Sequence, residues 1–475
     1  MWYQLVSLLS HVLYPFPSRF SDISHKPNQF VIKENSYISC IITPNRGLAM
    51  RRHTRRKVLA TTGAATAFSI SGCLGGDNGS DGTTIETRYM DAPGLDEFFD
   101  EHTQRFEEET GIHVEYEFVG WGEAQDTLIS DIMSRSGPDV HEIASTWIPE
   151  QYNADGWMDL ESDAVAEHLP STDTFEQGAI DVATFQDTLV GIPWFWGPRA
   201  YQQVDERIEA GGVSGTPSDW DELVDQADAY DGDDQYFAIM GSDYEPIRNF
   251  AMFLWQNGGQ LLTDDYSEPA FHGQEGVEAL EFYADLYAEY GVLSSETLEW
   301  GAADIQGAFT GGQMASTWGA LGTVSAYEED GNSIDDLSVS APPAGPGGDR
   351  GTFFGMELLG IHPWTDEPAA AAQWIEYLLR AEPNAAVSST VGFLPTNPEG
   401  LETEYFDNDL YRTFDEDVFP HARTYPQVIG WGEIESELNS MVFEVLQSAV
   451  TDDLEAGDVE DALHQAASVA EQTLE

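Results

Sequence analysis

The sequence predicts an α/β protein built from two lobes. Short runs of alternating or continuous apolar residues are separated by amphipathic helical runs, an order typical of a mainly parallel sheet covered by helices. The chain has 475 residues. Even without its first 72 residues, it exceeds the limit of about 250–300 residues that one hydrophobic core usually reaches. We therefore expect two cores in one chain.

The first predicted elements form a strand–helix–strand unit. Residues 83–90 and 112–119 alternate as strands, and residues 95–109 carry apolar side chains at helical spacing. A helix at 124–134 and a short buried strand at 139–144 continue the pattern. The later expected elements are a strand at 188–193, a loop at 341–348, and helices at 164–169, 220–229 (opened by Ser218), 244–257, 274–290, 368–379 and 434–450.

Residues 50–73 have the layout of an export signal, with a cationic start, an apolar core and a small-residue end. The segment Thr54-Arg55-Arg56-Lys57-Val58-Leu59 resembles a twin-arginine signal. The segment Ile70-Ser71-Gly72-Cys73 resembles a lipobox. The apolar core is shorter than the roughly 20 residues that span a bilayer. We expect Cys73 to be the lipidated first residue of the mature chain.

The residues on either side of this signal differ in composition from the rest of the chain. Residues 1–49 are more basic than the residues after the signal, and a signal belongs near the start of its chain, so we expect Met50 to be the initiator and residues 1–49 to be an extension from a mis-assigned start. Residues 74–83 are glycine-rich and have too few apolar residues to form a hydrophobic core, which predicts a flexible tether.

The mature chain is strongly acidic. Nine of the 19 basic residues but only two of the 85 acidic residues precede Cys73, which leaves ten arginines, no lysine and 83 acidic residues, a net charge of −73. The acidic residues are dispersed among apolar ones, as on a solvated surface. Molar salt reduces the Debye length to about 3 Å and screens such repulsion. We expect a salt-adapted protein that does not bind nucleic acid.

Cysteine and histidine usage gives no sign of a metal or cofactor. Cys73 is the only cysteine of the predicted mature chain, and its eight histidines lack ligand spacing. Neither a serine elbow, nor a zinc-protease motif, nor a phosphate loop is present. Carboxylate pairs are uninformative in so acidic a chain. We predict no catalytic residue, no cofactor and no metal.

Several segments in consecutive order resemble the family 1 extracellular solute-binding proteins, which include the maltose binders. The matching segments are Phe106–Val114, Ser136–Val140, Ala154–Leu160, Gly191–Pro193, Gly215–Leu223, Gln256–Gly259, Phe309–Ala315, Gly351–Gly360, Ala372–Leu379 and Gly392–Pro395. Each segment is short and unspecific, and their shared order carries the resemblance.

The resemblance implies two Rossmann-like α/β lobes joined by a hinge, as in the class II type of periplasmic binding protein. Lobe 1 would comprise residues 84–193 with 353–389, and lobe 2 residues 194–352 with 390–475. A monomer of this kind would hold a small solute, most simply a carbohydrate, in a cleft between the lobes. It would deliver that solute to the membrane permease of an ABC importer from the outer face of the cell membrane.

Sugar sites combine aromatic rings with polar side chains, so aromatic residues at expected turns are candidate contacts. Trp194 and Trp196 follow the predicted crossing between lobes. Ser145 and Trp147 follow a strand, where open α/β sheets bind ligands. The complete set of expected ligand-binding residues is Trp121, Ser145, Trp147, Trp194, Trp196, Trp318, Phe354, Glu357 and Trp431. Trp220, Trp255 and Trp374 lie on helical runs and are expected in the core.

Some positions depart from the sugar binders. Ala144 stands where many have a carboxylate, Gln202-Gln203 replaces a tyrosine–asparagine pair, and Leu321 replaces an aromatic residue. A secreted carbohydrate-active enzyme with two catalytic carboxylates remains an alternative. A surface adhesion protein would predict repeats or many short strands, and neither is visible.

Overall fold

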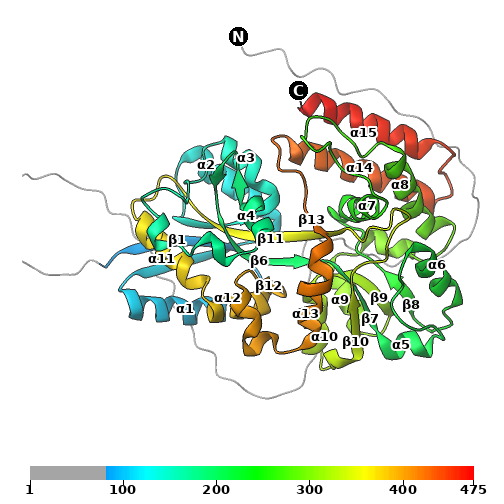
Figure 1. The fold of residues 1–475 in the computed structure, drawn as a ribbon, viewed down its shortest axis with the longest axis horizontal. Helices are drawn as coiled ribbons and strands as arrows, with labels where there is room; N and C mark the ends of the chain where they lie inside the picture. Colours follow the sequence, from blue (N-terminus) through cyan, green and yellow to red (C-terminus); the bar gives the residue numbers. More distant parts are fainter. Residues whose placement is uncertain (1–81, 475) are drawn as a thin grey trace, which may run out of the picture. The chain divides into compact units, whose positions relative to one another are not determined.

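The structure, a computed structural model, describes residues 82–474 (Figure 1). The chain divides into two units, Met1–Asp77 and Asn78–Glu475, and only the second contains described residues. The predicted export signal, Cys73 and most of the predicted tether lie outside them. Among the residues from 82 to 474, no helix is long and apolar enough to cross a membrane.

The larger sheet has seven strands in the order β12-β6-β11-β3-β1-β2, with β13 paired to β11. β1 pairs in parallel with β2 and β3, whereas β11 is antiparallel to both β3 and β6. The strands are β1 (Thr84–Met90), β2 (His113–Val119), β3 (Val140–Ala144), β6 (Ile192–Pro198), β11 (Thr352–Ile361), β12 (Leu394–Pro395) and β13 (Ala422–Arg423).

A smaller sheet of four strands has the order β10-β7-β9-β8. Its strands are β7 (Ala200–Val204), β8 (Gln235–Ala238), β9 (Met314–Gly319) and β10 (Leu337–Ser340), and a separate hairpin joins β4 (Thr184–Phe185) to β5 (Thr188–Leu189). A single residue, Arg199, separates β6 of the larger sheet from β7 of the smaller one. The chain returns through the loop between β10 and β11, so it crosses between the sheets at least twice.

Helices pack on both sheets. They are α1 (Leu95–Thr110), α2 (Trp121–Ser134), α3 (Ile148–Asn153), α4 (Gln177–Ala183), α5 (Asp205–Ala210), α6 (Trp220–Ala229), α7 (Glu245–Gln256), α8 (Gln274–Ala288), α9 (Ala302–Thr310), α10 (Leu321–Glu329), α11 (Pro368–Leu378), α12 (Ala381–Val391), α13 (Asp409–Thr413), α14 (Trp431–Val450) and α15 (Asp458–Leu474). The last two helices lie beside α7 and α8 (Figure 1).

The two faces of the larger sheet carry different helices. Tyr89 stacks on Phe99 of α1 with ring centroids 4.2 Å apart. Its neighbour Arg88 forms an ion pair with Asp131 of α2. Because successive side chains of a strand point to opposite faces, α1 and α2 cover opposite faces. Trp374 of α11 donates a hydrogen bond to the Tyr89 hydroxyl at 2.7 Å, which places α11 on the α1 face.

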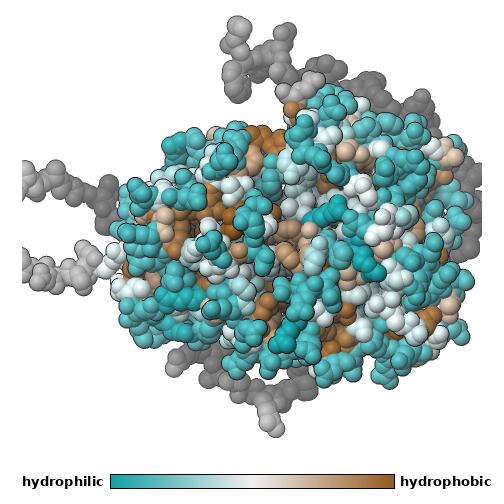
Figure 2. Space-filling model, in the orientation of Figure 1, coloured by the Kyte–Doolittle hydropathy of each residue, from teal (hydrophilic) through white to brown (hydrophobic). Residues whose placement is uncertain are grey.

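The α/β prediction is confirmed, as are the first strand–helix–strand unit and the loop at 341–348. Trp220, Trp255 and Trp374 are buried, as predicted. The division into lobes at the predicted boundaries stays a prediction. The face in Figure 2 is mostly hydrophilic with apolar patches, in keeping with a solvated acidic surface.

Two helix predictions were wrong in detail. Residues 164–169 form only a 3-10 turn, Ala166–His168, because Pro170 forces Leu169 into an extended conformation. α6 is capped by Asp219, whose carboxylate accepts from the Glu222 N–H at 2.9 Å, and not by Ser218.

The predicted strand at 188–193 is divided between β5 and β6. Gly191 lies against Leu358, where a Cβ atom would come within 2.9 Å of the leucine Cβ. The new strand then runs through Trp194 and Trp196, which were expected in a loop. All seven residues of β6 are buried between β11 and β12, so their continuous apolar run is that of a central strand.

Candidate functional site

The carboxyl ends of β1, β2 and β3 meet at one edge of the larger sheet, the edge at which open α/β sheets bind ligands. Trp121 begins α2 just after β2, and Trp147 ends a short turn just after β3. Their ring centroids are 6.2 Å apart. Trp121 is 48% exposed, and Trp147 is half-buried. This edge therefore presents two indole rings that are not enclosed by the core.

The segment before α14 reaches the same edge from the other end of the chain. The Gln427 side-chain amide donates to the Ser145 carbonyl at 3.3 Å. The Gly432 N–H donates to Glu150 Oε1, also at 3.3 Å. Trp431, the first residue of α14, is fully buried against Tyr425, with ring centroids 5.0 Å apart. Residues 425–432 thus join helices of the smaller sheet to the carboxyl edge of the larger one.

β11, between β3 and β6 in the larger sheet, presents a different set of side chains on each face. Phe354 and Met356 alternate with Phe353 and Glu357. Phe354 packs on Phe419 at 5.8 Å, whereas Phe353 packs on Tyr425 at 5.0 Å. The face that carries Phe353 and Glu357 is therefore the one that meets the segment before α14.

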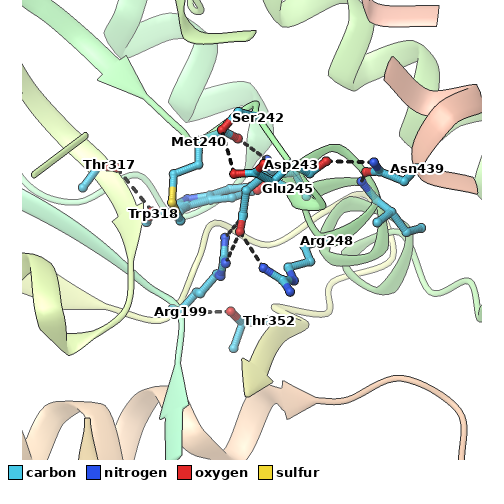
Figure 3. Close-up of polar contacts among 12 residues, drawn as sticks. Arg199, Met240, Ser242, Asp243, Glu245, Arg248, Thr317, Trp318, Thr352 and Asn439 are labelled. Carbon is cyan, nitrogen blue, oxygen red and sulfur yellow. Dashed lines mark hydrogen bonds and ion pairs between the residues drawn. The ribbon is translucent and has the colours of Figure 1, made fainter. Parts of the chain in front are cut away.

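A buried ion-pair network fixes the Arg199 crossing (Figure 3). Arg199 contacts both carboxylate oxygens of Glu245, with NH2 2.9 Å from Oε1, and Arg248 NH1 lies 2.7 Å from the same Oε1. Burial alone would raise the pKa of Glu245, but the two guanidinium groups outweigh it and lower the pKa to about 2. The Thr352 hydroxyl donates to the Arg199 carbonyl at 2.6 Å, which ties the crossing to β11.

Several buried polar atoms around this region have no hydrogen-bond partner among the described residues. Folded proteins pair most such atoms, so a concentration of unpaired ones marks a place where a solute or water can bind. They include Arg248 Nε, Glu357 Oε2, Thr424 Oγ1, Tyr425 OH, Gln427 Oε1 and the indole Nε1 of Trp431.

Carboxyl groups in this region have raised pKa values. Burial raises the pKa of Glu142 to about 8, and burial together with the nearby Glu142 raises that of Glu357 well above its usual range. On α14, burial raises the pKa of Glu435 to about 7, although the charge of Arg248 opposes this. The shifts of Glu142 and Glu357 favour the protonated form at neutral pH, in which a carboxyl group can donate as well as accept hydrogen bonds.

A surface hollow beside α1, α11 and α12 differs from this region. It is lined by Arg105, Glu109, Tyr377, Arg380 and Glu382 among others. Arg105 and Arg380 there are already paired with carboxylates at distances of 2.8–3.5 Å. Since the charged groups of this hollow satisfy one another, it lacks the unpaired polar atoms found near Glu357.

The structure brings together five of the residues predicted to bind ligand. Trp121, Ser145 and Trp147 lie at the carboxyl edge of the larger sheet, Glu357 lies beside that edge on β11, and Trp431 belongs to the segment that reaches it. Trp121 and Trp431 begin helices and do not lie in the expected loops, because α2 and α14 each start three residues earlier than predicted.

The other four predicted residues lie elsewhere. Trp194 is buried in the core against Tyr89, with ring centroids 5.3 Å apart. Trp196 and Phe354 both pack on Phe419, on the face of β11 opposite Glu357. Trp318 lies in β9 and not in a turn, packed on Phe237 and Phe253 at 5.6 and 4.9 Å. Because these four side chains are buried, they are poorer candidates for direct contact with a solute than Trp121 and Trp147.

Sequence reasoning missed the polar residues of the site, namely Glu142, Arg248, Tyr425, Gln427 and Glu435. Glu142 lies in a short buried strand beside His141, and Arg248 lies in a helix beside Asn249, so no local sequence signal marks either residue. Among the described residues, no group of three or more histidines, cysteines or acidic residues could hold a metal ion. The arrangement suits hydrogen bonding and ring stacking rather than metal chemistry.

Comparison with known proteins identifies the family and the fold of this chain. The family of bacterial extracellular solute-binding proteins matches residues 101–411. A putative binding protein of Brucella abortus is 24% identical over 347 residues, which cover 71% of this chain and 82% of the relative.

Solved structures resemble the fold closely. An ABC transporter solute-binding protein of Thermotoga lettingae bound to α-D-tagatose aligns with a TM-score of 0.72 and 23% identity, covering 83% of this chain and all of that chain. A maltose-bound protein of T. maritima aligns with the same TM-score and 21% identity, covering 82% of this chain and 99% of that chain. The fold is thus that of two-lobed binding proteins of ABC importers, and the chain belongs to the family of bacterial extracellular solute-binding proteins.

Proposed function

We propose that this protein captures a sugar or a sugar-like polyhydroxylated solute between its two lobes and delivers it to the permease subunits of an ABC importer. The observation that carries the proposal is the meeting of the segment before α14 with the carboxyl edge of the larger sheet. There, two accessible indole rings, Trp121 and Trp147, lie near buried polar atoms that lack partners among the described residues. Stacking rings and hydrogen-bonding groups together suit a sugar.

The contacts between the lobes also support a closing motion. Gln427 to Ser145 and Gly432 to Glu150 are single hydrogen bonds of 3.3 Å between the segment around the start of α14 and the turn and helix that follow β3. Bonds of this length are weak and can break and form as the lobes separate and approach. A solute that bridges the same surfaces would favour the closed form, and the permease would receive that form.

The sequence supports a place of action outside the cell. The proposal includes twin-arginine export, lipidation at Cys73 and display of a monomer on the outer face of the membrane, tethered by residues 74–83. The ten arginines and 83 acidic residues of the mature chain favour a saline environment. Binding should therefore be measured at molar salt.

The test is a titration of the purified protein with neutral sugars and polyols, followed by tryptophan fluorescence and by thermal unfolding. We expect at least one sugar to shift both signals, with no turnover of that sugar. Trp147→Ala should weaken binding, whereas Trp364→Ala, which removes a half-buried tryptophan stacked on His362 at 4.1 Å, should not. Hydrolysis of an oligosaccharide would favour a secreted carbohydrate-active enzyme instead.

A further inference from the structure

One face of β11 has a gap in the middle of the strand. Phe353, Gly355 and Glu357 share that face because side chains alternate. A Cβ atom added to Gly355 would meet only the edge of the Phe353 ring, at 4.0 Å. Gly360 on the same strand differs, since its Cβ would come within 2.5 Å of Ile143. Gly355 is therefore not required by close packing, and its missing side chain leaves room between Phe353 and Glu357.

This gap is also the accessible part of the strand. Gly355 is half-buried, whereas the other nine residues of β11 are buried. A glycine inside a strand weakens it and often marks a place where a ligand approaches the backbone. An open position on an otherwise buried strand fits that description.

A buried carboxyl group, Glu357, borders the gap, and a second one, Glu142, lies beyond it. Glu357 lies opposite Ala144 of β3, and Leu359 lies opposite Glu142, so the two glutamates are diagonal neighbours on one face. Glu357 is 6% exposed and Glu142 is 2% exposed. Glu142 Oε2 accepts the Met90 N–H at 2.7 Å, and Glu357 Oε2 accepts from no described residue. Glu357 thus offers a buried oxygen that no described residue uses.

Burial and mutual repulsion favour the protonated form of the pair, although the charge of Arg248 opposes this for Glu357. Neither Glu142 nor Glu357 forms a salt bridge within residues 82–474. A buried carboxylate without a cation is costly, and two adjacent carboxylates repel each other. The raised pKa values of both groups agree with this argument. A protonated carboxyl group offers both a donor and an acceptor, as a sugar hydroxyl does.

The other side of the gap carries polar atoms from the second lobe. The Arg248 guanidinium lies 5.5 Å from the centre of the Phe353 ring, and the Tyr425 ring lies 5.0 Å from it. Arg248 Nε and the Tyr425 hydroxyl are buried and have no partner among the described residues. A group placed above Gly355 would therefore meet hydrogen-bonding atoms from both lobes.

We propose that the space above Gly355 is a subsite for an uncharged hydroxyl-bearing group of the solute, recognised by Glu357 with Glu142 behind it. This inference rests on the proposed function and specifies its solute class. A hydroxyl group exchanges donor and acceptor roles with the protonated pair. An ammonium group finds no carboxylate charge there. The subsite selects neutral sugars over amino sugars.

The first test fills the gap. Gly355→Ala should weaken binding of the best neutral sugar by about tenfold or more, the value of one buried hydrogen-bonding contact. It should leave thermal unfolding unchanged, since the added methyl group meets no protein atom closer than 4.0 Å. Gly307→Ala in α9, where a Cβ atom also meets nothing within 4 Å, is the matched control and should bind as the unmodified protein does.

The second test asks whether the Glu357 side chain acts through its hydrogen-bonding groups and not through a negative charge. Glu357→Gln keeps a donor and an acceptor and should retain most of the affinity for the neutral sugar, whereas Glu357→Leu should lose about tenfold or more. The unmodified protein should bind the matching hexosamine at least tenfold more weakly than the neutral hexose. If the protein binds a neutral sugar but Gly355→Ala and Glu357→Leu retain full affinity, the subsite is wrong. If it binds no sugar at all, the proposed function is wrong.

Discussion

Arg199, the single residue between β6 and β7, contacts both carboxylate oxygens of Glu245 at the start of α7. This ion pair holds the crossing between the sheets against a helix of the second lobe. Arg248 binds the same carboxylate from the next turn of α7, so one buried acid is shared by two arginines. Residues 82–474 contain only ten arginines and no lysine, and two of these arginines are committed to this junction.

Removal of one partner should destabilise the fold. Glu245→Gln leaves Arg199 buried without its counter-charge, a change that typically costs about 3–5 kcal/mol. The measurement is urea unfolding at molar salt. Arg105→Gln, which breaks exposed ion pairs on α1, is the control and should cost no more than about 1 kcal/mol. Equal effects of the two substitutions would contradict a structural role for the junction.

The lowered pKa of Glu245 predicts that the folded protein loses stability in acid. Its pKa is lowered to about 2 in the folded state, so its contribution to stability is complete above the ordinary glutamate pKa of about 4.3 and is lost as the pH falls toward 2. Glu245→Gln should therefore flatten the fall in unfolding free energy between pH 4.5 and pH 2. A slope that the substitution leaves unchanged would show that other groups dominate in this range.

The raised pKa of Glu142 predicts the opposite dependence of stability on pH. Its folded-state pKa of about 8 lies above the ordinary value, so the folded state binds the extra proton and loses stability as the pH rises from about 4.5 to 8. Glu142→Gln should raise the melting temperature at pH 9 relative to the unmodified protein and change it little at pH 4.5. A melting temperature difference that does not vary with pH would mean that Glu142 is not a buried titrating group.

Two tryptophans should behave differently. Trp194→Ala removes a fully buried ring that packs on Tyr89, and such truncations typically cost about 3–5 kcal/mol. Trp147→Ala removes a half-buried ring and should instead weaken solute binding by about fivefold or more, the effect of a contact worth over 1 kcal/mol. Urea unfolding and fluorescence titration of both variants check this contrast. A stable Trp194→Ala variant with weakened binding would restore Trp194 as a contact residue.

The proposed lipid anchor at Cys73 can be tested in cells. Cys73→Ser should move the protein from the membrane fraction to the medium, because the thiol that would carry the lipid is absent. Replacement of Arg55 and Arg56 by lysine should instead retain the precursor inside the cell. Membrane association of the Cys73→Ser protein would contradict lipidation at this position.

The sequence predicted the α/β class and most early elements because their apolar periodicity is local. It placed Trp194 and Trp196 in a loop because the strand of which they are part is buried on both faces, and such strands lack alternation. Their glycine and proline neighbours suggested a turn. Burial between β11 and β12 depends on residues about 160–200 positions away, which periodicity cannot detect.

The candidate site was predicted only in part, because local sequence patterns identify some of its residues and long-range contacts place the others. Trp121, Ser145 and Trp147 follow strands, so the general rule for parallel sheets identified them. Glu142 and Arg248 could not be distinguished by type, since carboxylates are abundant in this chain and Arg248 lies within a helix. Their place in the site depends on the pairing of β3 with β11 and on the contact of α7 with Phe353.

Calorimetric titration of the purified protein with neutral sugars at molar salt tests the central claim most directly. The expected result is one binding site per chain for at least one neutral sugar, weakened about tenfold by Gly355→Ala and unaffected by Gly307→Ala. Absence of heat with every neutral sugar, together with an unchanged melting temperature, would contradict solute capture of this kind.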